Sequence, residues 1–151
     1  MITFAREDFG PLYPEMLPLL EMHYKEIAWN IDNIPLDVDV EKYQALDESG
    51  VLFCFSARDK GKLVGYAAFL LHPHPHYKST MFASNDVIFL LKSHRGKKIG
   101  VDFLEFCCAE LKAFGAQVTA IRIKDCLNWS PLAQSIGFES VESTLLKWMG
   151  D

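Results

Sequence analysis

One turn in the sequence combines glycine with three cationic side chains, Arg95-Gly96-Lys97-Lys98-Ile99-Gly100. The hydrophobic run Val87–Leu91 precedes this turn and the amphipathic run Val101–Phe114 follows it. We therefore expect a strand that leads through the turn into a helix. The first N–H groups of a helix have no intrahelical acceptor, and the helix dipole adds partial positive charge there. The turn predicts an anion site that suits a phosphate or a pyrophosphate.

Two other phosphate-binding motifs are absent from the chain. It contains neither G-x-x-x-x-G-K-[ST] nor G-x-G-x-x-G, so a Walker loop and a dinucleotide fingerprint are excluded. On the turn alone, a charged loop that only solvates a strand–helix junction remains an alternative.

The bulk composition limits the class of protein. The 151 residues carry a formal net charge of −5, which argues against nucleic acid as a partner. The length fits one domain spanning residues 1–151. No apolar run is long enough to cross a bilayer, so no membrane partner is expected. Four cysteines without C-x-x-C spacing favour reduced thiols and a cytoplasmic location. A homodimer is compatible with the sequence.

Hydrophobic periodicity predicts the order β-α-α-β-β-β-α-β-α-β. Residues Ile2–Arg6 form the first expected strand, and a regular helix is expected to begin near Pro18 and end at Ile27, because proline suits only the first turn of a helix. The remaining expected elements are helices at Val40–Glu48, Val101–Phe114 and Ser130–Ile136, strands at Val51–Arg58, Leu63–Leu71, Phe82–Leu91, Gln117–Lys124 and within Phe138–Trp148, and a rigid loop at His72–Tyr77.

Three separated phrases, in the right order, resemble the GCN5-related N-acetyltransferases (the GNAT superfamily). The turn Arg95–Gly100 resembles their Arg/Gln-x-x-Gly-x-Gly/Ala pyrophosphate loop, with Lys98 in the place of the middle glycine. Gly61–Tyr66 resembles their second hairpin, and Leu132–Glu139 is similar to their closing Ala-x-x-Tyr-x-x-Leu-Gly-Phe phrase. Length and the phrase Ser93-His94-Arg95-Gly96 are also similar to small phage and prophage members of this family.

The resemblance implies an α+β, α/β/α layered fold with a mixed, mostly antiparallel central sheet and about four helices. It also implies acetyl-CoA as cosubstrate. The pantetheine arm would then bind backbone groups of the strand before the turn, with an N–H near Leu90 polarising the thioester carbonyl. The residues implied in cofactor binding are Ile88, Phe89, Leu90, Arg95, Gly96, Lys97, Lys98, Ile99, Gly100, Val101 and Asn128.

Lys98 and Asn128 each have two interpretations. If the turn requires a positive φ at Lys98, the lysine costs about 1 kcal/mol relative to glycine; if φ is negative, the lysine adds a useful charge. Asn128 either contacts the cofactor, as the family asparagine does, or is only a turn residue at the entry to a helix.

Acetyl transfer to an amine requires a proton acceptor, a stabilised thioester oxygen and two reactants held together. Asp86 is the candidate base, because the family often places a carboxylate on this strand. A strand-edge aspartate that forms an ion pair is the alternative. Asn85 could orient a water molecule, and His72, His74 and His76 are alternative bases. A metal site at these histidines is not expected, because nothing nearby completes it.

Ala133 occupies the position of the family's tyrosine acid. Coenzyme A leaves as a stable thiolate that solvent can protonate, and the substitutes considered are Ser130, Cys126 and Tyr77. The expected function is acetyl transfer from acetyl-CoA to a primary amine by direct attack. The alternative is a catalytically degenerate member that serves in binding or structure. The first two helices, their loop and the His-Pro loop should wall the acceptor site, with Tyr24, Trp29, Tyr77 and Trp148 as candidate lining residues.

Overall fold

A five-stranded sheet with strand order β1-β2-β3-β4-β5 forms the centre of the molecule. The computed structural model describes all 151 residues. Strands β1 to β4 pair antiparallel and β4 pairs with β5 in parallel, so the mixed, mostly antiparallel α+β fold is confirmed. The strands are β1 (Ile2–Glu7), β2 (Leu52–Asp59), β3 (Lys62–His74), β4 (Tyr77–Leu90) and β5 (Val118–Ala120), and the helices are α1 (Phe9–Ile27), α2 (Val40–Glu48), α3 (Ile99–Ala113) and α4 (Ser130–Gln134).

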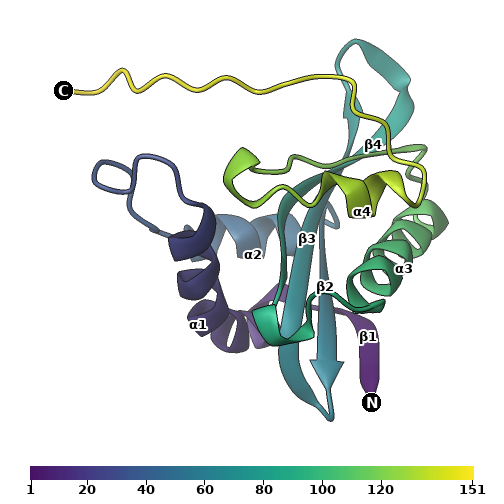
Figure 1. Cartoon of the computed structure of the whole chain (residues 1–151). Coiled ribbons are helices and arrows are strands. Elements are labelled where there is room, and N and C mark those ends of the chain that lie inside the picture. Colours follow the sequence, from purple (N-terminus) through teal and green to yellow (C-terminus); the bar gives the residue numbers. More distant parts are fainter.

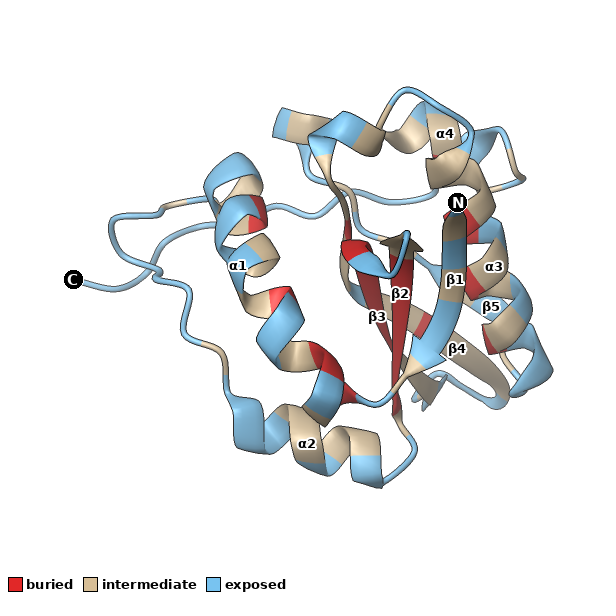
Figure 2. Ribbon diagram, turned by 90° about the horizontal axis from the view of Figure 1, so that it is seen from below, coloured by how far each residue is buried: buried red, intermediate tan, exposed pale blue.

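Helices cover both faces of the sheet, with α1 and α2 on one face and α3 on the other (Figure 1). Successive side chains of a strand point to opposite faces, and β2 is buried on both (Figure 2). Leu52 and Cys54 pack beneath α1, whereas Phe53 and Phe55 pack against α3. Two separate apolar cores therefore hold the three layers together.

Helix α1 begins earlier than its prolines suggest. The prediction that it begins near Pro18 is wrong, because the helix begins at Phe9 and includes Pro14 and Pro18. Both prolines are exposed, so water can reach the carbonyl groups whose helical hydrogen bonds the prolines remove. Asp47 of α2 accepts a hydrogen bond from the Phe9 N–H at 3.0 Å and caps the helix from outside.

None of the helices has the length and hydropathy that crossing a membrane requires.

The predicted rigid loop at His72–Tyr77 is instead the end of a long hairpin. β3 continues to His74 and β4 begins at Tyr77. Pro73 is tolerated inside β3 because β2 pairs with β3 only as far as Leu70, which leaves no strand on that side of Pro73.

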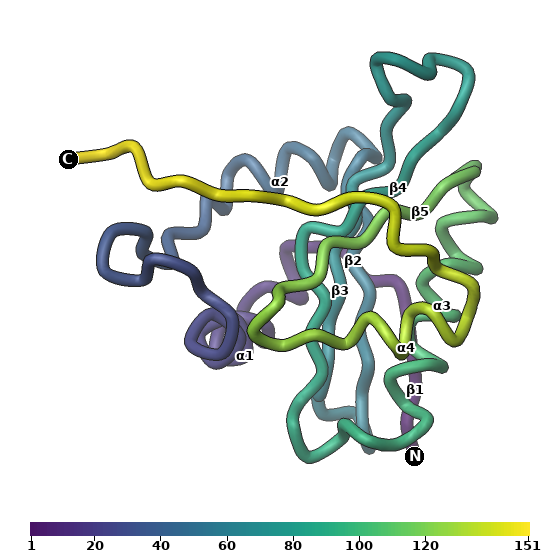
Figure 3. The backbone as a smooth tube through the Cα atoms, turned by 45° about the horizontal axis from the view of Figure 1, so that its top comes forward, coloured from purple at the N-terminus to yellow at the C-terminus, as the bar shows by residue number.

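The predicted last strand within Phe138–Trp148 does not form. Residues 138–151 contain no helix or strand and run away from the sheet (Figure 3). The neighbouring β5 has only three residues, shorter than the predicted Gln117–Lys124, and offers little edge for pairing. Val141, Leu145 and Met149 therefore remain largely exposed.

Candidate active site

A β-bulge in β4 directs Asp86 toward the α1–α2 layer. Ala68 of β3 pairs with Val87, but the next residue, Phe69, pairs with Asn85, so Asp86 is the additional residue. Two residues of a bulged strand then oppose one on the partner, and the alternation of side chains is interrupted there. Asp86 and Val87 consequently line the same cavity under α1 and α2.

This cavity has a volume of about 110 Å³ and a predominantly apolar lining. Asp86 is its single charged residue, and the other lining residues are Phe9, Tyr13, Met16, Leu20, Leu36, Val38, Tyr43, Cys54, Ala68 and Val87. The two helices and their connecting loop line this cavity, and the His-Pro loop does not, so the predicted walls of the acceptor site stay a prediction. None of the four aromatic residues predicted to line the acceptor site contributes to this cavity.

Tyr43 of α2 holds the carboxylate of Asp86. Its hydroxyl donates a hydrogen bond to Asp86 Oδ2 at 2.5 Å, and its ring stacks on Phe9 with centroids 5.2 Å apart. Burial, together with the neighbouring Asp86, raises the pKa of Tyr43 well above its usual value. Tyr43 therefore remains a hydrogen-bond donor at neutral pH and fixes the position of the carboxylate.

Strands β4 and β5 separate just before the bulge. Their pairing ends at Ser84 and Ala120. The Asn85 side chain then bridges the widening gap, because its oxygen accepts from the Arg122 N–H at 2.7 Å and its amide donates to the Arg122 carbonyl at 3.4 Å. Asn85 thus joins the two strands, and β4 beyond it has no partner strand on that side.

Backbone groups of β4 point into this opening at every second residue. Leu91 donates its N–H to the Val64 carbonyl of β3 at 2.8 Å. In an antiparallel pair the direction alternates, so Phe89 also faces β3, whereas Ile88 and Leu90 face the opening. The Leu90 carbonyl accepts a hydrogen bond from Arg95 Nε at 2.7 Å. Of the three predicted arm-binding residues, Ile88 and Leu90 present backbone groups to the opening, and Phe89 contributes its ring to the α1 side.

The basic turn has the geometry of an anion cradle. Gly96 has a φ of 76°, which glycine adopts without strain. The N–H groups from Gly96 to Val101 donate no backbone hydrogen bond. The first backbone hydrogen bond of α3 is donated by the Asp102 N–H to the Lys98 carbonyl. A Cβ on Gly100 would lie 3.0 Å from Leu132 Cδ1, so this glycine permits close packing of α3 on α4. These free donors fit a diphosphate.

Lys98 has a φ of −65° at the N-cap of α3, so the residue carries no glycine-like strain. We therefore expect Lys98→Gly and Lys98→Ala to bind acetyl-CoA with affinities that agree within about twofold, because neither variant relieves strain and both remove the same charge. Isothermal titration calorimetry on both variants measures this. A Lys98→Gly variant that binds tenfold more tightly than Lys98→Ala would contradict this geometry.

Arg95 joins the turn to the end of α1. Its two terminal nitrogens donate to the Glu26 carboxylate at 2.8 and 2.9 Å, and its guanidinium lies 5.4 Å from the centroid of the Phe89 ring. The Arg95 hydrogen bonds lower the pKa of Glu26. Arg95 is thus oriented by Glu26 and by the Leu90 carbonyl.

His23 lies beneath this junction. Its Nδ1 is 3.2 Å from the Tyr66 hydroxyl, and its ring centroid is 5.0 Å from that of Phe89. Burial lowers the pKa of His23 from 6.5 to about 4, so the imidazole is neutral in the folded protein at neutral pH. The neutral ring supports the side chain of Phe89 on β4.

We expect His23 to make stability depend on pH. The unfolded chain binds the proton near pH 6.5 and the folded protein near pH 4, so stability is complete above 6.5 and falls as the pH drops toward 4. The slope is at most about 1.4 kcal/mol per pH unit. Urea unfolding at pH 5 and pH 6.5 should show a smaller difference in His23→Asn than in the wild type. Equal differences in the two proteins would exclude this role.

Asn128 has the contact of a turn residue. Its side-chain oxygen accepts the Ser130 N–H at 3.0 Å, just before α4. The amide nitrogen has no protein partner, so cofactor contact by Asn128 stays a prediction.

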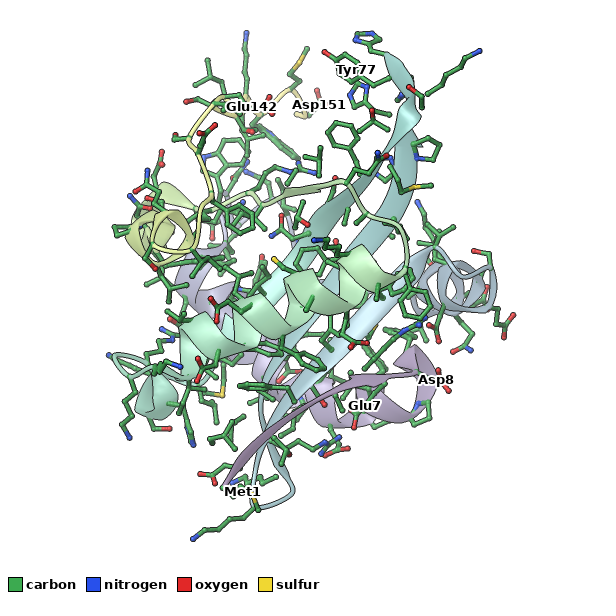
Figure 4. The ribbon with its side chains drawn as sticks, turned by 90° about the vertical axis from the view of Figure 1, so that its right-hand side faces the viewer. Met1, Glu7, Asp8, Tyr77, Glu142 and Asp151 are labelled. Atoms are coloured by element: carbon green, nitrogen blue, oxygen red, sulfur yellow. The ribbon has the colours of Figure 1, made fainter.

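None of the candidate acids lines the cavity beside Asp86. Ala133 is buried on α4 and has no proton to give. Tyr77 lies at the outer tip of the β3–β4 hairpin, where it packs on His74 (Figure 4). Cys126 is exposed beside the end of α1, with Sγ 3.9 Å from the Glu26 carbonyl. His74 and His76 pack against Tyr77 at this tip, and His72 lies on β3 opposite Phe82. No group of three potential ligands in the chain could hold a metal ion.

Sequence reasoning missed Tyr43, Glu26 and His23. Tyr43 and Asp86 are 43 residues apart, and Glu26 and Arg95 are 69 apart, so no local pattern signals these pairs. The single signal was the helical spacing that places His23 among the apolar residues of α1.

The family model of the acetyltransferase (GNAT) family matches residues 7–130. The chain therefore belongs to the GNAT family of acetyltransferases, whose members use acetyl-CoA. No curated protein matches the chain in sequence.

Solved structures share the fold at low sequence identity. A GCN5-related N-acetyltransferase from Ralstonia eutropha JMP134 aligns with a TM-score of 0.79 and 14% identity, over 99% of this chain and 100% of that one. An aminoglycoside acetyltransferase from an uncultured soil metagenomic sample, in complex with sisomicin, aligns with a TM-score of 0.75 and 14% identity, over 99% of this chain and 95% of that one. A predicted acetyltransferase from Clostridium acetobutylicum, with acetyl-CoA, aligns with a TM-score of 0.72 and 14% identity, over 97% of this chain and 96% of that one.

Proposed function

We propose that the protein transfers the acetyl group of acetyl-CoA to a primary amine by direct attack within a ternary complex. The proposal rests on one observation: the bulge in β4 lies between the cavity that contains Asp86 and the opening between β4 and β5. Asp86 lines an apolar cavity, and two residues later the backbone of Ile88 faces the unpaired opening between β4 and β5. A carboxylate and a free backbone donor thus lie two residues apart on one strand.

The turn and the strand after the bulge would hold acetyl-CoA. The free N–H groups from Gly96 to Val101 suit its diphosphate, and the backbone of Leu90 and Ile88 suits the amides of its pantetheine arm. Asp86 is about 7 Å along the strand from Ile88 and about 13 Å from Leu90, at ~3.3 Å per residue. The N–H of Ile88, rather than that of Leu90, is therefore the proposed donor to the thioester oxygen.

Asp86 is the proposed proton acceptor. It would take a proton from the substrate ammonium, either directly or through one water molecule, while the Tyr43 hydroxyl keeps the carboxylate in place. The amine nitrogen then forms the new C–N bond as the C–S bond breaks. Coenzyme A departs as a thiolate, which solvent protonates because Ala133 offers no acid.

A catalytically degenerate coenzyme A-binding protein is the second candidate, and Ala133 is the observation that favours it. Titration with acetyl-CoA followed by a thiol-release assay over a set of amines separates the two. Micromolar binding with amine-dependent thiol release supports the proposal. Binding without release from any amine would support the degenerate protein, and absence of binding would refute both.

A further inference from the structure

The cavity beside Asp86 has one charged end and an apolar body. Ten of its eleven lining residues are hydrophobic, and they come from α1, α2, the connecting loop and the sheet. We propose that the amine acceptor is a small monoamine whose ammonium pairs with Asp86 and whose compact apolar body fills the cavity. This inference rests on the proposed function.

The size of the cavity limits the body of the acceptor. Its volume is about 110 Å³. A cavity of about 150 Å³ with a similar apolar lining binds benzene in another protein. A branched alkyl group of four or five carbons therefore fits this cavity, and a single aromatic ring is near its upper limit.

The connecting loop contributes apolar side chains on the solvent side of the cavity. Leu36 lines the cavity and is 37% exposed, so it borders the solvent side. Ile34, on the same connecting loop, is 40% exposed. An apolar substrate gains about fourfold in affinity for each methylene group that it buries at such a site.

A second cationic group would find no partner in this cavity. Asp86 is its single charged residue, and an unpaired charge in an apolar site is strongly disfavoured. Another cavity, beside the N-terminal half of α1, contains Glu7, Asp8 and Glu15, and Arg58 forms ion pairs with Glu7 and Glu15 at 3.0 and 2.9 Å. Inside the Asp86 cavity, the additional ammonium groups of polyamines and aminoglycosides therefore find no carboxylate.

Matched amines test the proposal in the wild-type protein. Isoamylamine and 1,4-diaminobutane have similar lengths, and only the second carries another ammonium group. We expect kcat/KM in the thiol-release assay to be at least ~10-fold higher for isoamylamine. An equal or higher value for 1,4-diaminobutane or kanamycin would overturn the substrate class, although the proposed function would stand.

One substitution should reduce the preference for the monoamine over the diamine. Leu36→Asp places a carboxylate on the solvent side of the cavity, and we expect it to lower the ratio of isoamylamine to 1,4-diaminobutane by about tenfold. Val40→Asp is the matched control, because Val40 is equally exposed at 40% but does not line the cavity. Its ratio should stay within about twofold of the wild type, and the same fall in both variants would exclude a local effect.

Amine binding provides a readout that does not depend on turnover. Calorimetry with the wild-type protein loaded with coenzyme A, which has no acetyl group to transfer, should show binding of isoamylamine and at least ~10-fold weaker binding of 1,4-diaminobutane. If acetyl-CoA binds but neither amine does, the inference fails. If acetyl-CoA itself does not bind, the proposed function fails first.

Discussion

Asp86→Asn should lower kcat/KM for the amine by about 100-fold, with the affinity for acetyl-CoA unchanged. The substitution removes the proton acceptor but keeps the shape of the side chain, and general bases contribute about 10²–10⁴-fold. The asparagine side chain can still accept the Tyr43 hydrogen bond, so the cavity should keep its form. Thiol release measures the rate, and calorimetry with acetyl-CoA measures the binding.

Two variants complete this experiment. Asp32→Asn removes an exposed carboxylate outside the cavity, and its rate should equal that of the wild type. Tyr43→Phe removes the hydroxyl that orients Asp86, and its effect should fall mainly on kcat, with a loss of about tenfold. An unchanged rate in Asp86→Asn would remove Asp86 from the mechanism.

Gly65→Ala should weaken acetyl-CoA binding by about tenfold or more and destabilise the fold by about 1–3 kcal/mol. A Cβ at Gly65 would lie 2.8 Å from the Phe89 carbonyl oxygen and 2.9 Å from Leu90 Cδ1. Because the backbone oxygen cannot rotate away, β4 must shift at the residues that face the opening. Calorimetry measures the affinity, and urea unfolding measures the stability.

Gly10→Ala is the control for this substitution. Its Cβ would lie 3.2 Å from Gln44 Oε1, which is the end of a flexible side chain. In the first part of α1, alanine should stabilise the helix by up to about 1 kcal/mol. Wild-type acetyl-CoA affinity in Gly65→Ala would show that Phe89 and Leu90 tolerate displacement.

The basic turn was predictable because its signal is local. A strand, a glycine, three cations and an amphipathic run follow one another in the chain, and the structure builds a helix at Ile99 with free N–H groups before it. The conformation of Lys98 was not predictable, because a lysine accepts either sign of φ at different cost. The positive φ falls on Gly96 instead.

The rest of the site depends on contacts between distant segments. No glycine or proline marks the bulge at Asp86, so the register of β3 against β4 is needed to see that this side chain points under α2. Tyr43 meets Asp86 because α2 packs on the sheet, which the sequence of α2 does not encode locally. A strand was predicted within Phe138–Trp148, but a strand also requires a partner, and β5 ends at Ala120.

Because Asp86 is the additional residue of the bulge, the pairing of β3 with β4 does not depend on it. Phe69 pairs with Asn85 and Ala68 pairs with Val87, so β4 contains one residue more than β3 requires at this point. A chain that lacks Asp86 would restore the regular ladder between these two pairs and would keep every other residue of the sheet on its present face. Loss of a single codon would thus convert a carboxylate-bearing pocket into one without any charged residue, within the same scaffold.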